Sequence, residues 1–155
     1  MESNHFDAEG AARMVDVSDK AVTVRTAVAE TLVHMQPATL ATIRAGQHAK
    51  GDVLAVARLA AIMASKQTPQ LIPLCHAIPI EAVEVAFEEV DESRLRCQVM
   101  VRTSAKTGVE MEAMTAAAIA GLTIYDMCKS VDRGMELEKV CLVSKLGGKS
   151  GLFER

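Results

Sequence analysis

The chain has 155 residues, a net charge of −3 and 50% hydrophobic residues, with no Trp, one Tyr and three Phe. This length suits a single domain with one core, packed mainly by aliphatic side chains. The charge balance gives no support for nucleic-acid binding, which needs a basic stripe, and no apolar run is long enough to predict a membrane span.

The cysteine pattern bears on the compartment and on metal binding. The four cysteines, Cys75, Cys97, Cys128 and Cys141, include no Cys-x-x-Cys pair, and the N-terminus carries no apolar run. We therefore expect reduced thiols and a cytoplasmic protein. His76 stands beside Cys75 without further ligands at a metal-binding spacing, so neither a metal nor another cofactor is expected.

The beginning of the chain predicts a loose arm followed by strands. Residues 1–12 are expected to be flexible, and the apolar and acidic segment Met14–Val17 is expected to add a short strand. The many β-branched residues of Ala21–Met35 predict a longer strand.

Two helices are expected next. Pro37 begins a short helix that ends at Gly46, in keeping with the preference for proline early and glycine late. Asp52 is a good N-cap for a second helix, whose apolar residues recur at helical spacing. This helix is expected to end before Thr68-Pro69, because proline and the residue before it disfavour a helix, and a proline-rich loop follows over 68–79.

The second half of the chain predicts a hairpin, a helix and a strand. Glu81–Val90 and Arg94–Arg102 alternate between apolar and polar residues, which is typical of antiparallel strands. A long helix over Val109–Val131 and a strand over Met135–Lys145 follow. The glycine-rich tail, residues 147–155, is expected to be flexible.

The order of these elements predicts the fold class. Strand, helices, hairpin, helix and strand together favour an α+β protein, with helices packed on one face of an antiparallel sheet. We expect residues 1–155 to form one domain. The alanine-rich middle of the long helix indicates close packing against a neighbouring element.

Two carboxylates, Glu110 and Glu112, stand where the long helix is expected to begin. Residues two apart diverge in a helix but share a face in an extended segment, so both serve one site only if 108–112 is extended or turning. Acidic residues in a first helical turn also interact favourably with the helix dipole. Spacing alone leaves these two interpretations evenly balanced.

An acid and a base, Asp126 and Lys129, lie three residues apart near the end of the same helix. Such a pair is most often an exposed ion pair that contributes about 0.2–0.5 kcal/mol. The neighbours Tyr125, Met127 and Cys128 are not typical of exposed positions. They favour a role for Asp126 as an acid or base and for Lys129 as a phosphate ligand or proton donor.

Two other segments carry candidate ligand groups. Leu71–His76 is an apolar, proline-containing loop that ends in a thiol and an imidazole, and rigid loops hold binding groups well. Lys50 precedes a helix N-terminus, a position that favours anions. The ordinary alternatives are a buried cysteine, a surface histidine and a solvated lysine in a turn.

Several blocks of the chain together resemble one family, the cyclic pyranopterin monophosphate synthases, or protein C family of molybdenum cofactor biosynthesis. The resemblance runs from about Met14 to Gly151, with the blocks in the family's order. The blocks are Met14–Ser18, Lys50–Asp52, Leu71–His76, Thr107–Ala113, Leu122–Lys129 and Gly147–Gly151.

The resemblance implies a fold, an assembly and an activity. It implies a ferredoxin-like α+β fold in a homohexamer, a trimer of dimers, with active sites near a subunit interface. It also implies a lyase that acts on a cyclised dihydroguanosine triphosphate, the product of the preceding radical enzyme. The implied product is the cyclic phosphate of a pyranopterin, with pyrophosphate released.

Site residues are carried over by position. The resemblance implies that Asp126 is the main catalytic residue, with Lys129 and Lys50 as its partners. Lys149 is a further candidate for the same site. Substrate contacts are implied for Leu74, Cys75, His76, Met111 and Glu112, with Glu110 and Lys145 as second-rank members of the pocket.

The length of the long helix gives an independent reason to expect shared sites. A helix of roughly 20 residues spans about 30 Å, so its two ends are not expected to contact one small substrate within a single chain. Two other functions stay open on sequence. One is a non-catalytic assembly that binds a ligand, and the other is a thiol-dependent hydrolase using Cys75 and His76, although no orienting third group is identifiable.

Overall fold

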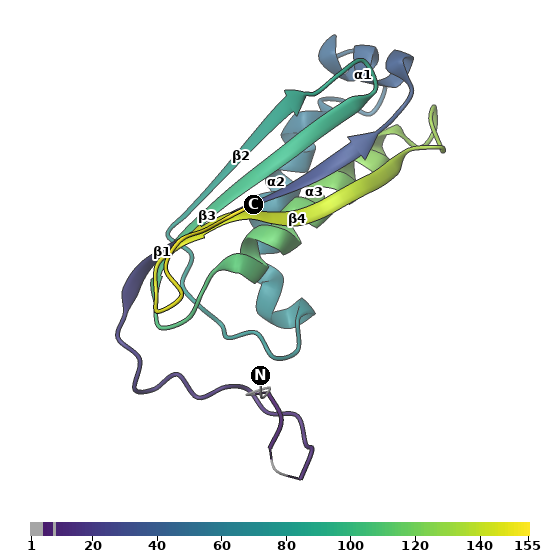
Figure 1. Ribbon diagram of the computed structural model, residues 1–155. Helices are drawn as coiled ribbons and strands as arrows, with labels where there is room; N and C mark the ends of the chain where they lie inside the picture. The colour runs from purple at the N-terminus through teal and green to yellow at the C-terminus, as the bar shows by residue number, and fades with distance from the viewer. Residues whose placement is uncertain (1–4, 8) are drawn as a thin grey trace.

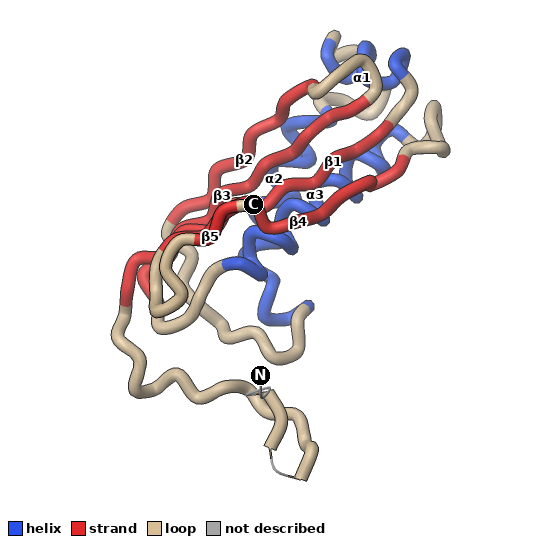
Figure 2. Tube along the Cα trace, in the orientation of Figure 1, coloured by secondary structure: helices blue, strands red, loops and turns tan. Residues whose placement is uncertain are grey.

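The computed structural model describes residues 5–7 and 9–155, so residues 1–4 and 8 of the predicted N-terminal arm lie outside the described residues. Figure 2 shows helices and strands in separate colours along the chain. The elements are β1 (Thr23–His34), α1 (Pro37–Arg44), α2 (Val53–Leu71), β2 (Ala82–Glu89), β3 (Arg94–Ala105), α3 (Glu110–Cys128), β4 (Glu136–Leu146) and β5 (Phe153–Glu154).

The strands form one antiparallel sheet in the order β2-β3-β1-β4-β5. Helices α2 and α3 lie side by side across one face of this sheet, and α1 lies at one end (Figure 1). β1 and β3 pair along their whole length, from Thr23 opposite Ala105 to His34 opposite Arg94. The arrangement is ferredoxin-like and confirms the predicted α+β class with helices on one face of the sheet.

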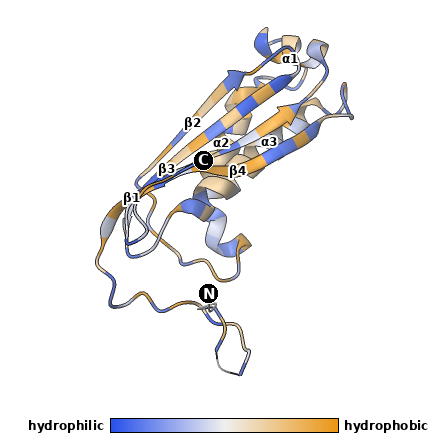
Figure 3. Ribbon diagram, in the orientation of Figure 1, coloured by the Kyte–Doolittle hydropathy of each residue, from blue (hydrophilic) through white to orange (hydrophobic). Residues whose placement is uncertain are grey.

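The core forms where the alternating strands meet the helices. Every second residue of β3 is buried over most of its length, and the strands show the same alternation in colour in Figure 3. From α3, four alanines are fully buried against the sheet and α2: Ala113, Ala116, Ala117 and Ala120. A Cβ added at Gly121 would lie 3.1 Å from Thr31 Oγ1, so this helix packs as closely to β1 as a glycine allows.

The structure corrects two predictions. Met14–Val17 is not a strand, because it pairs with no neighbouring strand, and the side chain of His76 contacts the carbonyl of Val15 instead. Helix α2 does not end before Thr68-Pro69 but continues to Leu71. Pro69 lies in the last turn, where it removes a single backbone donor, and Ile72 N still closes the turn on Thr68 O at 2.9 Å.

The predicted C-terminal tail forms a short edge of the sheet. β5 pairs with β4 through Ser144 opposite Glu154 and Lys145 opposite Phe153. The backbone of Arg155 donates to Val143 O at 2.9 Å. The tail therefore lies alongside β4, and its expected flexibility stays a prediction.

We predict that Ala117→Leu lowers the free energy of unfolding by about 1–3 kcal/mol, because the larger side chain overpacks a fully buried position between helix and sheet. Urea denaturation at fixed protein concentration measures this change. Ala41→Leu on the exposed face of α1 is the matched control and should stay within about 0.5 kcal/mol of the original protein. Equal effects of the two substitutions would contradict the packing described for α3.

Candidate active site

Helix α3 separates the candidate residues into two groups. The α3 C-terminal cluster consists of Lys50, Asp126 and Lys129. The α3 N-terminal cluster consists of Leu74, Cys75, His76, Glu110, Met111, Glu112 and Lys145. The loop after α1 supplies Lys50, the loop after α2 supplies residues 74–76, and β4 supplies Lys145.

In the α3 C-terminal cluster, the structure brings the three predicted residues together. Lys129 Nζ lies 2.6 Å from Asp126 Oδ1, and Lys50 Nζ donates to the backbone carbonyl of Asp126 at 2.8 Å. The side chains of Asp126 and Lys129 are 62% and 52% exposed. In the single chain the pair is thus an exposed ion pair, joined by a second lysine from another element.

This lysine-rich setting fixes the charge of the cluster. The hydrogen bond from Lys129, its charge and the charge of Lys50 lower the pKa of Asp126. The same hydrogen bond raises the pKa of Lys129. At neutral pH the cluster therefore holds a carboxylate beside ammonium groups, which suits the stabilisation of anionic ligand groups.

The α3 N-terminal cluster is built around a buried carboxyl group. Glu112 is 1% exposed, Cys75 Sγ donates to its Oε1 at 3.5 Å, and its Oε2 has no hydrogen-bond partner among the described residues. Burial raises the pKa of Glu112. A buried carboxyl oxygen without a partner is costly, so it marks a group that a ligand or another chain can satisfy.

Glu110 takes a different direction from Glu112, as expected for a helical start. Both residues lie in the first turn of α3, so they diverge around the helix and do not share a face as they would in an extended segment. Lys145 Nζ donates to Glu110 Oε1 at 2.9 Å. A Cβ at Gly108 would overlap the Glu110 carboxylate, so glycine at this position leaves room for the ion pair. Met111 is exposed beside it.

A cavity of about 470 Å³ lies between five members of this cluster and the N-terminal arm. Leu74, Cys75, His76, Glu110 and Met111 all line it. His76 Nε2 lies 2.8 Å from Val15 O, so the imidazole joins the loop after α2 to the arm. The arm therefore forms one wall of this cavity, through Val15, Val17 and Lys20.

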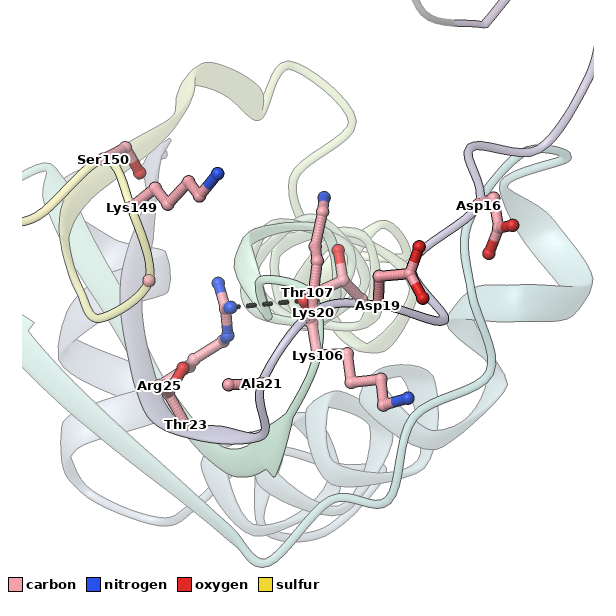
Figure 4. Close-up of a pocket in the computed structure, with 11 residues that line it drawn as sticks. Asp16, Asp19, Lys20, Ala21, Thr23, Arg25, Lys106, Thr107, Lys149 and Ser150 are labelled. Atoms are coloured by element: carbon pink, nitrogen blue, oxygen red, sulfur yellow. Dashed lines mark hydrogen bonds between the residues drawn. The ribbon is translucent and has the colours of Figure 1, made fainter.

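A larger cavity of about 750 Å³ lies next to the first, and sequence reasoning missed most of its charged residues. Four cationic and two acidic side chains line this cavity (Figure 4). They are Lys20, Arg25, Lys106 and Lys149, and Asp16 and Asp19. Only Lys149 was singled out from the sequence. In the sequence, Arg25 is distinguished only as a cation within a segment of β-branched residues that predicts a strand. Lys20 and Lys106 belong to no recognisable motif.

Arg25 is held in place by the backbone on two sides. It donates to Ala105 O at 3.1 Å through Nε and to Lys106 O at 3.2 Å through Nη2. A Cβ at Gly148 would overlap its guanidinium, so the glycine-rich tail passes directly over Arg25. The tail thereby places Lys149 at the rim of the same cavity.

The two clusters do not meet within one chain. Glu112 and Asp126 stand at opposite ends of α3, about 21 Å apart at a rise of 1.5 Å per residue. The structure therefore places the predicted residues near one another within each cluster but not in a single pocket of this chain, and their roles stay predictions.

The contacts of Cys75 argue against a thiol nucleophile. Burial and the nearby Glu112 carboxyl group raise the pKa of Cys75 to about 11, which leaves the thiol protonated at neutral pH. The ring nitrogen Nε2 of His76 is engaged with Val15 O. The two neighbours thus show no catalytic dyad.

The described residues contain neither a candidate membrane-spanning helix nor a cluster of metal ligands. No helix in residues 5–7 and 9–155 is long and apolar enough to cross a membrane. Within the same residues, no three His, Cys, Asp or Glu side chains are grouped so that they could hold a metal ion.

Comparison with known proteins identifies the family. Residues 14–148 match the model described as the MoaC family, which includes both clusters. The chain belongs to the MoaC family. Two similar relatives are cyclic pyranopterin monophosphate synthases. The protein of Rhodopirellula baltica is 56% identical to this chain, and the match covers 99% of this chain and 93% of the relative. The protein of Desulfitobacterium hafniense is 54% identical, and the match covers 100% of this chain and 95% of the relative.

A third MoaC relative bears the same name. The cyclic pyranopterin monophosphate synthase of Dinoroseobacter shibae is 58% identical over 97% of this chain and 96% of its own length. These matches confirm the family resemblance drawn from the sequence blocks. They extend over almost the whole chain, from the arm that carries Val15 to the tail that covers Arg25.

We predict that Glu112→Gln becomes more stable relative to the original protein as the pH rises. Burial raises the pKa of Glu112 in the folded state above the ordinary value of 4.5, so the folded state binds more protons above that value. The original protein therefore loses stability as the pH rises through this window, and the Gln variant does not. Urea denaturation from about pH 4 to about pH 8 at fixed protein concentration measures the difference.

The control for this pH series is Glu84→Gln, an exposed carboxylate on β2. Its stability difference from the original protein should stay nearly constant with pH. If the stability of Glu112→Gln relative to the original protein does not increase as the pH rises, the prediction is wrong and the pKa of Glu112 is not raised by folding.

Proposed function

We propose that this protein is a cyclic pyranopterin monophosphate synthase, a lyase of molybdenum cofactor biosynthesis. Its substrate is a cyclised dihydroguanosine triphosphate, made by the preceding radical enzyme, and its products are the cyclic phosphate of a pyranopterin and pyrophosphate. The observation that carries the proposal is identity of 54–58% along nearly the whole chain to relatives with this name.

The α3 C-terminal cluster supplies the main catalytic groups. Loss of pyrophosphate develops negative charge on the leaving oxygens, and Lys50 and Lys129 are placed around Asp126 to stabilise such charge. Asp126, held ionised, is suited to accept a proton during ring rearrangement.

The α3 N-terminal cluster supplies a second set of proton carriers and the substrate contacts. Glu112 carries a raised pKa and an unpartnered oxygen, so it is suited to donate a proton or a hydrogen bond to the ring. His76 and Glu110 line the cavity of about 470 Å³, with Leu74, Cys75 and Met111 as apolar and thiol contacts. Lys145 forms an ion pair with Glu110 beside them.

The larger cavity is suited to the triphosphate. Its cations come from the arm, from β1, from the end of β3 and from the tail, so they approach a ligand from several sides: Lys20, Arg25, Lys106 and Lys149. Arg25 is fixed by backbone carbonyls and presents a rigid donor group. The volume of about 750 Å³ lies in the range of ligand-sized sites.

The proposed site is assembled from more than one subunit of a homohexamer, a trimer of dimers. The support is physical, because α3 separates the clusters by more than the length of a small substrate. Asp126 and Lys129 are also exposed at the surface of the single chain, where a second chain can cover them. All four cysteines are free thiols, which fits a reducing cytoplasm.

Replacing either member of the ion pair should abolish turnover. We expect Asp126→Asn and Lys129→Ala to lower kcat by about a hundredfold or more, because each removes a charge that acts in the transition state. Pyrophosphate release from the cyclised triphosphate measures turnover, and size-exclusion chromatography and circular dichroism check assembly and fold. Lys66→Ala, an exposed lysine of α2, is the control and should keep full activity.

Full activity in Asp126→Asn or Lys129→Ala would refute the assigned roles. Loss of activity in Cys75→Ser together with activity in Asp126→Asn would instead support the thiol-dependent alternative.

Mixing two inactive variants tests the shared site. Asp126→Asn damages one cluster and Glu112→Gln the other, so each pure protein should be nearly inactive. If a site combines the two clusters from neighbouring chains, random reassembly from denaturant should restore up to about a quarter of full activity, because one site in four then receives two intact halves.

A mixture that stays as inactive as its components would contradict a site shared between chains. The matched control mixes Asp126→Asn with Lys129→Ala. Both variants damage the same cluster, so this mixture should recover no activity.

A further inference from the structure

A buried carboxylate, Asp132, lies close to the α3 C-terminal cluster and has no part in the chemistry described so far. It follows the end of α3 and is 2% exposed. Buried carboxylates are costly unless hydrogen bonds satisfy them, so their partners indicate what they hold.

Both oxygens of Asp132 are bonded to the segment that begins α1. Oδ2 accepts from Gln36 N at 2.8 Å and from Thr39 Oγ1 at 3.1 Å. Oδ1 accepts from Gly134 N at 3.2 Å, with Gln36 Nε2 at 3.5 Å. The bonds therefore link the loop after α3 to the start of α1 across 96 positions of sequence.

Helix α1 has no N-terminal cap of its own. Gln36 occupies the N-cap position without a side-chain hydrogen bond to the helix, and the first turn contains no acidic residue. The Asp132 carboxyl group instead accepts from the backbone N–H of Gln36 and from the Thr39 hydroxyl, and it lies at the positive end of the helix dipole. The interaction fixes where α1 starts.

The two segments joined by Asp132 are the two that supply the catalytic cluster. On one side, the backbone of Asp132 itself donates to Cys128 O, the last residue of α3, at 3.0 Å, close to Asp126 and Lys129. On the other side, α1 leads through a short loop to Lys50, whose Nζ reaches the Asp126 carbonyl. A shift between α1 and the end of α3 would move Lys50 relative to the ion pair.

We propose that Asp132 is a positioning residue, which holds the loop of Lys50 and the end of α3 in the relative placement that the reaction needs. The inference rests on the proposed function of the cluster formed by Lys50, Asp126 and Lys129. The hydrogen bonds of the Asp132 side chain run to Gln36, Thr39 and Gly134 and to no member of that cluster. Its effect is exerted through the backbone of both segments.

The test compares Asp132 variants with a variant of similar stability loss elsewhere. Asp132→Ala should lower kcat by roughly ten- to a hundredfold with KM little changed, since small misplacements of reacting groups reduce the rate by this order. Asp132→Asn keeps one acceptor oxygen and should recover part of that rate. Val85→Ala, a buried residue of the edge strand β2, should keep kcat within about twofold.

All variants are assayed at a temperature at which circular dichroism shows them folded. Equal kcat values for Asp132→Ala and Val85→Ala would overturn the inference, since the carboxylate would then contribute stability alone. If Asp132→Ala does not fold, Asp132→Asn and Thr39→Val make the same comparison, because Thr39→Val removes one donor to Asp132. Lys129→Ala is measured in parallel, and its full activity would refute the proposed function rather than this inference.

Discussion

The close packing of α3 against the centre of the sheet is the constraint on which the rest of the structure depends. Ala113, Ala117 and Ala120 are fully buried, and a Cβ at Gly121 would press tightly against Thr31. Nineteen residues of helix held in this way form a rigid spacer of about 28 Å. The packing of the core therefore keeps the α3 N-terminal cluster and the α3 C-terminal cluster apart.

The two ends of this spacer offer opposite environments to their acids. At the N-terminal end, burial raises the pKa of Glu112 and favours its neutral form. At the C-terminal end, the neighbouring lysine lowers the pKa of Asp126 and favours its ionised form. Two carboxyl groups with displaced pKa values suit one acid and one base, and the proposed shared site would bring them together from two chains.

The order and type of the main elements could be predicted from the sequence, because alternation and helical spacing are local signals. The sequence could not exclude a strand at Met14–Val17, since a strand requires a partner that local pattern does not reveal. It also placed the end of α2 too early, because Pro69 is tolerated in a last turn. Arg25 and Asp132 could not be singled out from the sequence, since their hydrogen-bond partners lie in distant segments.

The most direct test of the account is a crystal structure of the inactive Lys129→Ala protein with the cyclised triphosphate bound. The account predicts that one substrate molecule contacts Glu112 or His76 of one subunit and lies beside Asp126 and Lys50 of a neighbouring subunit. A substrate bound entirely by residues of one chain would contradict the account. So would a substrate bound away from both clusters.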